Sequence, residues 1–189
     1  MRIAAAVSSG MHGALLLARG RADGVRYVED DMAGAARSFW AVALCLPAFV
    51  CLRLLAWTET GVPSHAAHLF ALDLLTYLVG WCGFAVLSHR LVRVMGLAPR
   101  WPRFIALWNW CNVVQYLLLV VFSIPGLLGA PALLDQSAQL FALGWALWLE
   151  WFAFRLTLGI GIIPAAGLVG VDVSLGVLLA AVSLPSGSG

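Results

Sequence analysis

Residues 38–57 read SFWAVALCLPAFVCLRLLAW and contain one charged side chain, Arg53. At a rise of about 1.5 Å per residue, a helix from Trp40 to Trp57 is roughly 25 Å long, close to the thickness of a bilayer's hydrocarbon core. Tryptophan favours the two membrane–water interfaces, so these residues stand where a membrane-crossing helix would place them. Pro47 should kink the helix, because proline lacks a backbone N–H.

The same apolar pattern recurs along the chain and predicts an all-α, polytopic transmembrane bundle over residues 38–184. The predicted spans are residues 38–57, 69–88, 104–128, 138–156 and 165–184. Of the 189 residues, 62% are hydrophobic and 11% are charged, and the mean hydropathy is +0.95. A soluble domain carries about 25% charged residues. A re-entrant segment is the alternative for the last span, because the stretch TLGIGIIP before it predicts a tight turn.

The ends of the chain differ from the bundle. Residues 1–37 form the main hydrophilic region and should lie in the cytoplasm. Helical spacing within this region predicts a short amphipathic helix at the membrane interface. The apolar positions that carry this prediction are Val7, Met11, Leu15 and Ala18. Residues 185–189, PSGSG, should be a flexible tail.

The distribution of arginine predicts the orientation, since cytoplasmic loops of membrane proteins carry an excess of basic residues. Arginines precede the first span or lie between spans two and three, at Arg2, Arg19, Arg21, Arg26, Arg37, Arg90, Arg93, Arg100 and Arg103. Residues 58–68 and 129–137 contain none. With five spans, the N-terminus is inside and the C-terminus outside. No stretch is basic enough for a nucleic-acid surface, so no nucleic-acid partner is expected.

Ionisable side chains within membrane spans are costly and mark candidate functional positions. Arg53 near the end of span one and Asp73 near the start of span two should share a depth, because a short loop joins these antiparallel helices. The sequence therefore predicts an ion pair between them. Alternatively, Arg53 extends its guanidinium to the outer interface by itself.

Spans four and five should contribute a second polar centre. Glu150 and Asp172 each lie about eleven residues from the intervening turn, so equal helical rise places them at similar depth. Arg155 should lie toward the cytoplasmic end and neutralise one of the two acids. Two ionised carboxylates close together repel strongly in a medium of low dielectric constant, so at most one should be ionised near neutral pH.

Spans two and three each present a polar face, since steps of three, four and seven residues return to one side of a helix. These faces comprise Asp73, Thr76, Tyr77 and Gly80 in span two, and Asn109, Asn112, Tyr116 and Ser123 in span three. They form hydrogen bonds between helices or line a ligand path. The predicted polar core consists of Asp73, Thr76, Tyr77, Asn109, Asn112, Tyr116, Glu150, Arg155 and Asp172.

Span four carries an aromatic stripe on the side opposite Glu150. Its members are Phe141, Trp145, Trp148 and Phe152, with Arg155 at its end. Such a stripe contacts lipid, docks a partner helix, or binds a flat hydrophobic cofactor such as a quinone or pigment.

No catalytic motif of the HExxH, GxSxG or P-loop type is present. His65 and His68 stand three residues apart without a third metal ligand, and the four cysteines lack CxxC spacing. The sequence therefore predicts neither an enzyme nor a metal site, and the identity of any cofactor stays open.

The stretch RGRADGVRYVEDDMAGAARSFWAV at residues 19–42, followed by a proline-bearing span, resembles the start of small uncharacterised bacterial inner-membrane proteins. Their layout is similar to Yip-type membrane proteins, and the likeness implies five spans and an inner-membrane location but no reaction. We expect a non-enzymatic accessory or organising subunit of a membrane complex, which associates with the bilayer and with other subunits or itself. The alternative is a small oligomeric transporter or proton-linked channel that uses the polar core.

Overall fold

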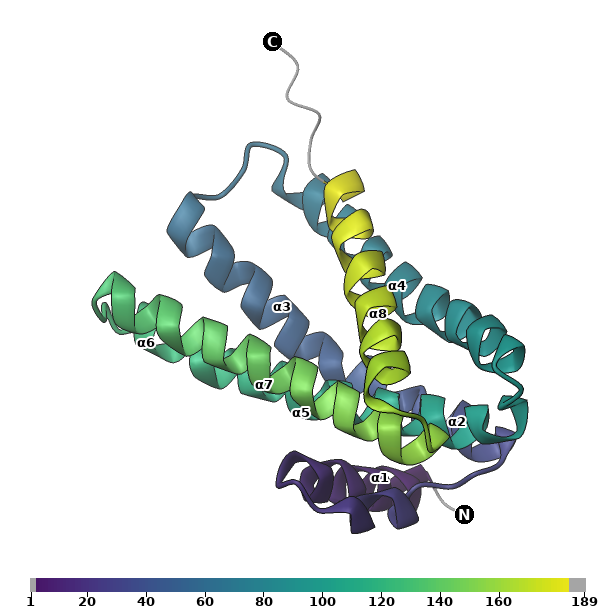
Figure 1. The fold of residues 1–189 in the computed structure, drawn as a ribbon. Helices are drawn as coiled ribbons and strands as arrows, with labels where there is room; N and C mark the ends of the chain where they lie inside the picture. Colours follow the sequence, from purple (N-terminus) through teal and green to yellow (C-terminus); the bar gives the residue numbers. More distant parts are fainter. Residues whose placement is uncertain (1–2, 184–189) are drawn as a thin grey trace.

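The computed structural model describes residues 3–183, and every regular element in that range is a helix (Figure 1). The α-helices are α1 (Ile3–Ala18), α2 (Met32–Ser38), α3 (Trp40–Thr60), α4 (Ala66–Val94), α5 (Trp101–Phe122), α6 (Ile124–Leu127), α7 (Ala132–Leu158) and α8 (Ile162–Ser183), and the 3-10 helices are η1 (Ala22–Tyr27) and η2 (Ala98–Arg100). The all-α prediction is confirmed. The tail predicted at residues 185–189 lies outside the described residues.

Four segments of the described chain are long and apolar enough to cross a membrane. They are residues 32–58, 66–94, 98–127 and 162–181. The 27-residue helix α7 has sufficient length but is not among them. Its polar side chains lower its hydropathy, and they are Asp135, Gln136, Gln139, Glu150 and Arg155.

Helix boundaries differ from the predicted spans where a polar end continues a helix or a proline interrupts it. The helix α4 extends from Ala66 to Val94, because its arginine-rich final turns stay helical beyond the apolar stretch. In contrast, α5 ends at Phe122, shortly before Pro125, which belongs to the separate turn of α6. Pro47 lies within α3 and does not end it.

The turn before α8 forms at Gly159, whose φ of +64° is left-handed and therefore suits glycine. Its N–H donates to the Arg155 carbonyl at 2.9 Å and caps α7. Pro164 falls in the first turn of α8, where a helix lacks hydrogen-bond partners for its N–H groups in any case. The helix α8 is continuous over 22 residues, and its residues 162–181 are among the segments long and apolar enough to cross a membrane.

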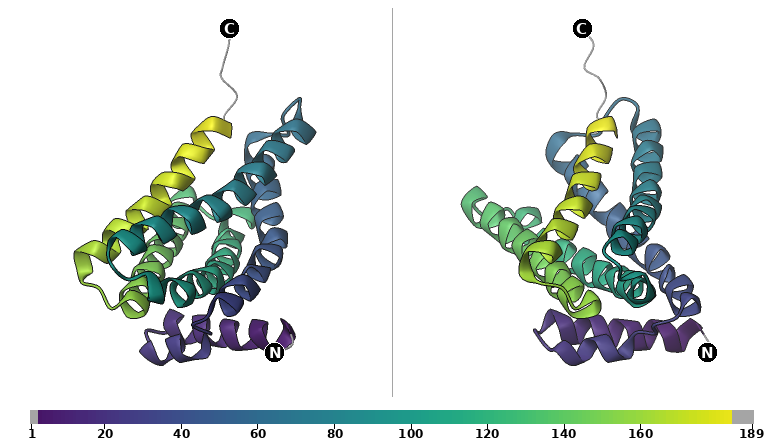
Figure 2. Two further views of the ribbon diagram at one scale, coloured as in Figure 1. Left: turned by 90° about the vertical axis from the view of Figure 1, so that its right-hand side faces the viewer. Right: turned by 45° about the vertical axis from the view of Figure 1, so that its right-hand side comes forward.

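The helix α5 lies at the centre of the packing and contacts α1, α2, α3 and α7. The helices α5 and α7 run side by side, whereas α3, α4 and α8 diverge from them (Figures 1 and 2). The helix α8 packs against both α4 and α7. One end of the molecule holds α1, the α4–α5 connection and the α7–α8 turn, and α8 ends at the other (Figure 1).

The helix predicted near the N-terminus is present as α1. Its buried residues are Ala6, Gly10, Gly13, Ala14, Leu16 and Leu17. Of the four apolar positions that predicted this helix, Val7, Met11 and Ala18 are partly buried against the core, and Leu15 is 41% exposed. Small residues decide this face, because they permit close contact with α5: a Cβ on Gly10 would lie 2.3 Å from Nε1 of Trp110.

Candidate polar cavity between α3, α4, α5 and α8

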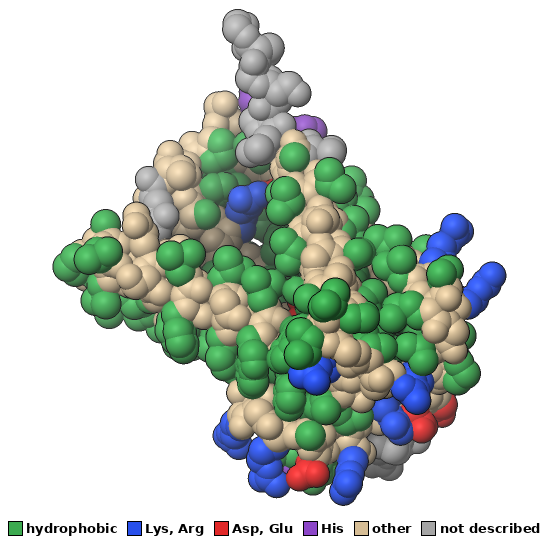
Figure 3. All heavy atoms as spheres, in the orientation of Figure 1, with side chains coloured by type: hydrophobic (Ala, Val, Ile, Leu, Met, Phe, Trp, Pro, Cys, Tyr) green, Lys and Arg blue, Asp and Glu red, His purple; other side chains and the backbone are tan. Residues whose placement is uncertain are grey.

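The diverging helices leave a cavity of about 550 Å³ between them, which is open to the surface. Helices α3, α4, α5 and α8 all contribute to its lining, and Figure 3 shows the surface hollowed between α3 and α8. The polar side chains of the lining are Arg53, Thr76, Tyr77, Asn112, Tyr116 and Asp172. The cavity therefore collects polar side chains from each of the surrounding helices.

The predicted pair of Arg53 and Asp73 is present, with Nη2 of Arg53 donating to Oδ1 of Asp73. The Asp73 side chain is buried, whereas that of Arg53 is 36% exposed and lines the cavity. The Thr76 hydroxyl donates to the backbone carbonyl of Asp73 at 2.9 Å, within its own helix. The Arg53 guanidinium thus lies at the cavity wall, and the buried Asp73 carboxylate, which does not line the cavity, neutralises its charge.

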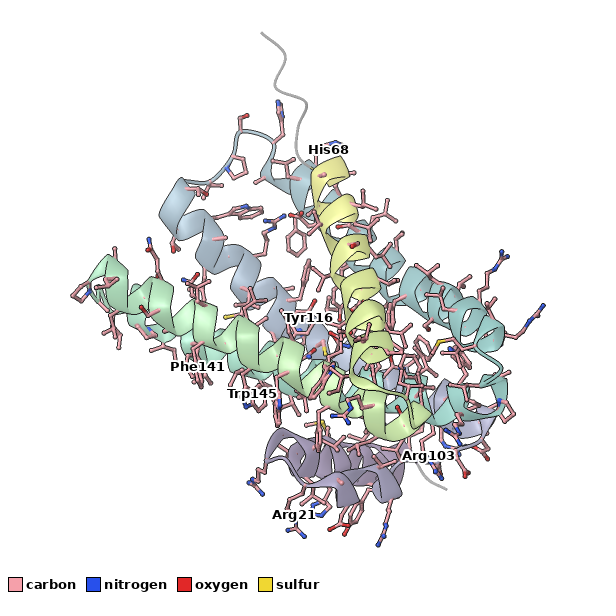
Figure 4. The ribbon with its side chains drawn as sticks, in the orientation of Figure 1. Arg21, His68, Arg103, Tyr116, Phe141 and Trp145 are labelled. Carbon is pink, nitrogen blue, oxygen red and sulfur yellow. The ribbon has the colours of Figure 1, made fainter. Side chains whose placement is uncertain are left out.

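Two tyrosines form the aromatic part of the wall. The Tyr77 hydroxyl donates to the Val42 carbonyl at 2.6 Å and links α4 to α3. The Tyr77 ring also lies 6.1 Å from the ring of Tyr116, measured between centroids. Tyr116 projects from α5 toward the space between α3 and α8 (Figure 4). Trp81 and Trp108, whose ring centroids are 5.0 Å apart, complete this wall.

Asp172 and Glu150 meet at the inner side of the cavity, as the sequence predicts for spans four and five. Asp172 lines the cavity from α8 and accepts a hydrogen bond of 3.4 Å from Nε1 of Trp108. The Glu150 side chain reaches the Asp172 carboxyl from α7 and is 4% exposed. No basic side chain forms an ion pair with either acid among residues 3–183.

The predicted role of Arg155 as the counterion of these acids is wrong. Arg155 instead places its guanidinium 4.7 Å from the ring centre of Trp151, in a cation–π contact. Five residues separate Glu150 from Arg155, which corresponds to about 140° around a helix, so the two side chains point in different directions. The pair of acids is left without an arginine.

The residues of the predicted polar face of α5 do not all face the cavity, since Asn109 contacts α2 and Asn112 lines the cavity. Nδ2 of Asn109 donates to the Ser38 hydroxyl at 2.7 Å, so this fully buried side chain belongs to the contact with α2. Asn112 lines the cavity, but its Nδ2 donates at 3.0 Å to the Trp108 carbonyl in its own helix. Residues three apart differ by about 60° in direction, which suffices to give them different neighbours. Asn109 is therefore not part of the cavity.

The aromatic stripe of α7 faces away from the cavity. Phe141 is 61% exposed and Trp148 is 37% exposed, while Trp145 and Phe152 are partly covered. Figure 4 shows Phe141 and Trp145 on the outer edge of α7. The rings of Trp148 and Phe152 are stacked, with an interplanar angle of 7°.

Sequence reasoning missed two side chains that connect to this site. The Trp108 indole is the donor to Asp172, and its position one turn before Asn112 was the available signal. Gln115 donates to the Ala146 carbonyl at 2.8 Å and links α5 to α7. The signal for Gln115 was an amide in the middle of an apolar span, which predicts a contact with another helix because lipid cannot satisfy its hydrogen bonds.

The chain matches no protein-family model, no curated protein and no solved structure.

Proposed function

We propose that the protein is an integral inner-membrane protein with five spans, of which α7 is the fourth, and with α1 on the cytoplasmic side. Arginine supports this orientation: the end of α4, the α4–α5 connection and the end of α7 carry Arg93, Arg100 and Arg155, at the same end of the molecule as α1 (Figure 1). The bacterial origin rests on the likeness to small inner-membrane proteins. A C-terminal reporter that is active only in the cytoplasm should stay silent, and a bright signal would contradict five spans.

We further propose that the cavity binds a small cation and that the protein acts as a small oligomeric transporter or proton-linked channel. The observation that carries this proposal is the surplus of acid around the cavity. Asp73 compensates Arg53, whereas Asp172 and Glu150 contact each other without a basic partner in the described chain. A cation, or a proton shared between the carboxyl groups, removes the repulsion that two adjacent carboxylates experience.

The wall of the cavity suits an organic cation. Trp81, Trp108 and Tyr116 present aromatic rings beside Asp172. Aromatic faces attract cations. Ligand pockets for small molecules have volumes of about 300–1,000 Å³, and this cavity of about 550 Å³ lies within that range.

The test uses purified full-length protein in liposomes, with a pH gradient and a pH-sensitive dye inside. Wild-type protein should dissipate the gradient, and Asp172→Asn should abolish this flux while the protein stays folded. Asp135→Asn is the matched control, because Asp135 lies near the start of α7 and does not line the cavity. Tetraphenylphosphonium is the probe for an organic cation, and its binding should weaken at least tenfold in Asp172→Asn. Equal flux and binding in both variants would overturn the proposal.

The aromatic stripe of α7 favours a second candidate, a non-enzymatic accessory or organising subunit. Phe141 and Trp148 are large side chains on the face that points away from the acids. This face fits an apolar helix of a partner subunit or, at the stacked rings of Trp148 and Phe152, a flat hydrophobic cofactor. Purification in mild detergent distinguishes the candidates: a stoichiometric larger complex, lost in Phe141→Ala/Trp148→Ala, supports the subunit, whereas a homo-oligomer supports the transporter.

A further inference from the structure

A second pocket lies at the end of the molecule that holds α1, outside the cavity described above. It has a volume of about 470 Å³ and is formed by α1 and η1. Its lining consists of His12, Leu16, Arg19, Arg21, Asp23, Arg26 and Tyr27. Figure 3 shows arginine side chains gathered along this edge, and Figure 4 labels Arg21 among them. The pocket is therefore rich in side chains that donate hydrogen bonds.

Charge compensation in this pocket is incomplete. Arg21 lies 3.6 Å from Asp23, but both side chains are more than half exposed, so the pair is weak. Arg19 and Arg26 have no carboxylate partner among residues 3–183. Three arginines and one aspartate leave a net charge of +2 on the lining.

The segment that carries these arginines contrasts with the next one along the chain. Arg37 pairs with Glu29 at 2.6 Å. Arg103 of α5 pairs with Asp30 at 2.7 Å. Glu29 and Asp30 thus pair with arginines outside the pocket, and Arg19 and Arg26 keep no carboxylate partner among residues 3–183.

The pocket is built on a closely packed pair of elements. A Cβ on Gly24 would lie 2.3 Å from the Gly13 carbonyl oxygen, so η1 approaches α1 as closely as only glycine permits. The Ser9 hydroxyl donates to the Tyr27 carbonyl at 2.6 Å. The rings of His12 and Tyr27 pack edge to face, with centroids 4.5 Å apart. These contacts fix the rim of the pocket without a ligand.

We propose that this pocket binds the phosphate group of an anionic lipid headgroup. Guanidinium groups present paired N–H donors that match phosphate oxygens. Leu15 in the last turn of α1 is 41% exposed and lies four residues before Arg19, which directly follows the helix. A face that combines an exposed leucine with arginine suits the boundary between headgroups and acyl chains, which favours a lipid over free phosphate as the source.

The experiment measures the lipid-dependent thermal stability of the full chain in neutral detergent. The probes are phosphatidylglycerol, phosphatidylcholine and inorganic phosphate at equal phosphate concentration. Phosphatidylglycerol should raise the melting temperature of the wild type, and Arg19→Gln/Arg26→Gln should weaken this binding by roughly tenfold or more. The matched control is Arg90→Gln/Arg93→Gln, which removes two exposed arginines at the end of α4 and should leave binding unchanged.

Each outcome bears on the proposal. An equal stabilisation by inorganic phosphate would overturn the lipid assignment, and an equal loss in both double variants would overturn the pocket. If Arg19→Gln/Arg26→Gln melts early without lipid, Arg19→Lys/Arg26→Lys replaces it. That variant keeps the charge but loses paired donation, so it should bind more weakly than the wild type, and unchanged binding would count against the pocket.

Discussion

The helix α5 is closely packed, whereas α3 and α8 leave an open cavity beside it, although all three helices are apolar enough for a membrane. Within the most apolar window of residues 98–127, 56% of residues are buried, whereas the corresponding windows of residues 32–58 and 162–181 are 11% and 17% buried. Helices α1, α2, α3 and α7 cover α5, while α3 and α8 leave the cavity between them.

This contrast shows that hydropathy identifies a span but does not give its place in the bundle. The helix α5 is buried because small residues of its neighbours permit close approach, as Gly10 does at Trp110. The cavity wall carries larger polar groups that need partners across a space, as Arg53 and Asp73 do. We therefore expect substitutions in the two regions to fail for different reasons.

The largest effect is expected for Asp73→Ala in the cavity wall. Removal of one partner of a buried ion pair costs about 3–5 kcal/mol, and the 36% exposure of Arg53 reduces this figure. The melting temperature in detergent should therefore fall sharply. The double variant Arg53→Met/Asp73→Ala should recover much of the loss, because no uncompensated charge remains. If the double variant is as unstable as the sum of the single variants, the two charges do not stabilise each other.

A somewhat smaller loss is expected for Gly10→Ala in the packed region. The new Cβ would lie 2.3 Å from Nε1 of Trp110, and overpacking of this kind costs about 1–3 kcal/mol. Gly170→Ala in α8 is the matched control, since a Cβ there meets nothing within 4 Å. Thermal unfolding of both variants measures the difference. Equal melting temperatures would show that the contact between α1 and α5 adjusts without cost.

Sequence patterns were sufficient for features that depend on periodicity and on spacing from a turn. The helical class follows from the recurring long apolar stretches. The closeness of Glu150 to Asp172 and the pairing of Arg53 with Asp73 follow from equal rise along antiparallel helices. The same reasoning placed Glu150 and the aromatic stripe on opposite sides of α7, because only the helical angle matters there.

Other features depend on which helices are neighbours, and the sequence does not contain this directly. Asn109 was assigned to the polar core, yet it contacts Ser38, because α2 packs on that side of α5. Arg155 was assigned to the acids from depth alone, although its direction carries it to Trp151. The contact of α1 with α5 was not predicted, because glycine and alanine create close contacts that a scale of hydrophobicity undervalues.

Tyr77→Phe tests a single hydrogen bond between the walls of the cavity. The hydroxyl donates to the Val42 carbonyl at 2.6 Å, and loss of such a bond costs about 0.5–1.5 kcal/mol. The melting temperature should fall modestly. Tyr27→Phe is the control, because the Tyr27 ring is exposed near the N-terminus and far from the cavity wall. A variant at Tyr77 that is as stable as the control would indicate that α3 and α4 are held by packing alone.

The smallest effect on stability is expected for Glu150→Gln, at the point where the two regions meet. Oε1 of Glu150 is buried without a hydrogen-bond partner, and no ion pair in the described chain depends on this carboxylate. An amide of the same shape keeps the packing and removes repulsion toward Asp172, so the melting temperature should be unchanged or slightly raised. Proton flux into liposomes should nevertheless be lost, because an amide, unlike a carboxyl group, does not take up and release a proton in this pH range. Glu29→Gln is the control and should have the opposite effects on stability and flux. It breaks the 2.6 Å pair with Arg37 and should lower the melting temperature, while proton flux persists in the folded fraction. Full flux through a folded Glu150→Gln protein would assign the two acids a purely structural role and leave the association of subunits as the better account of this bundle.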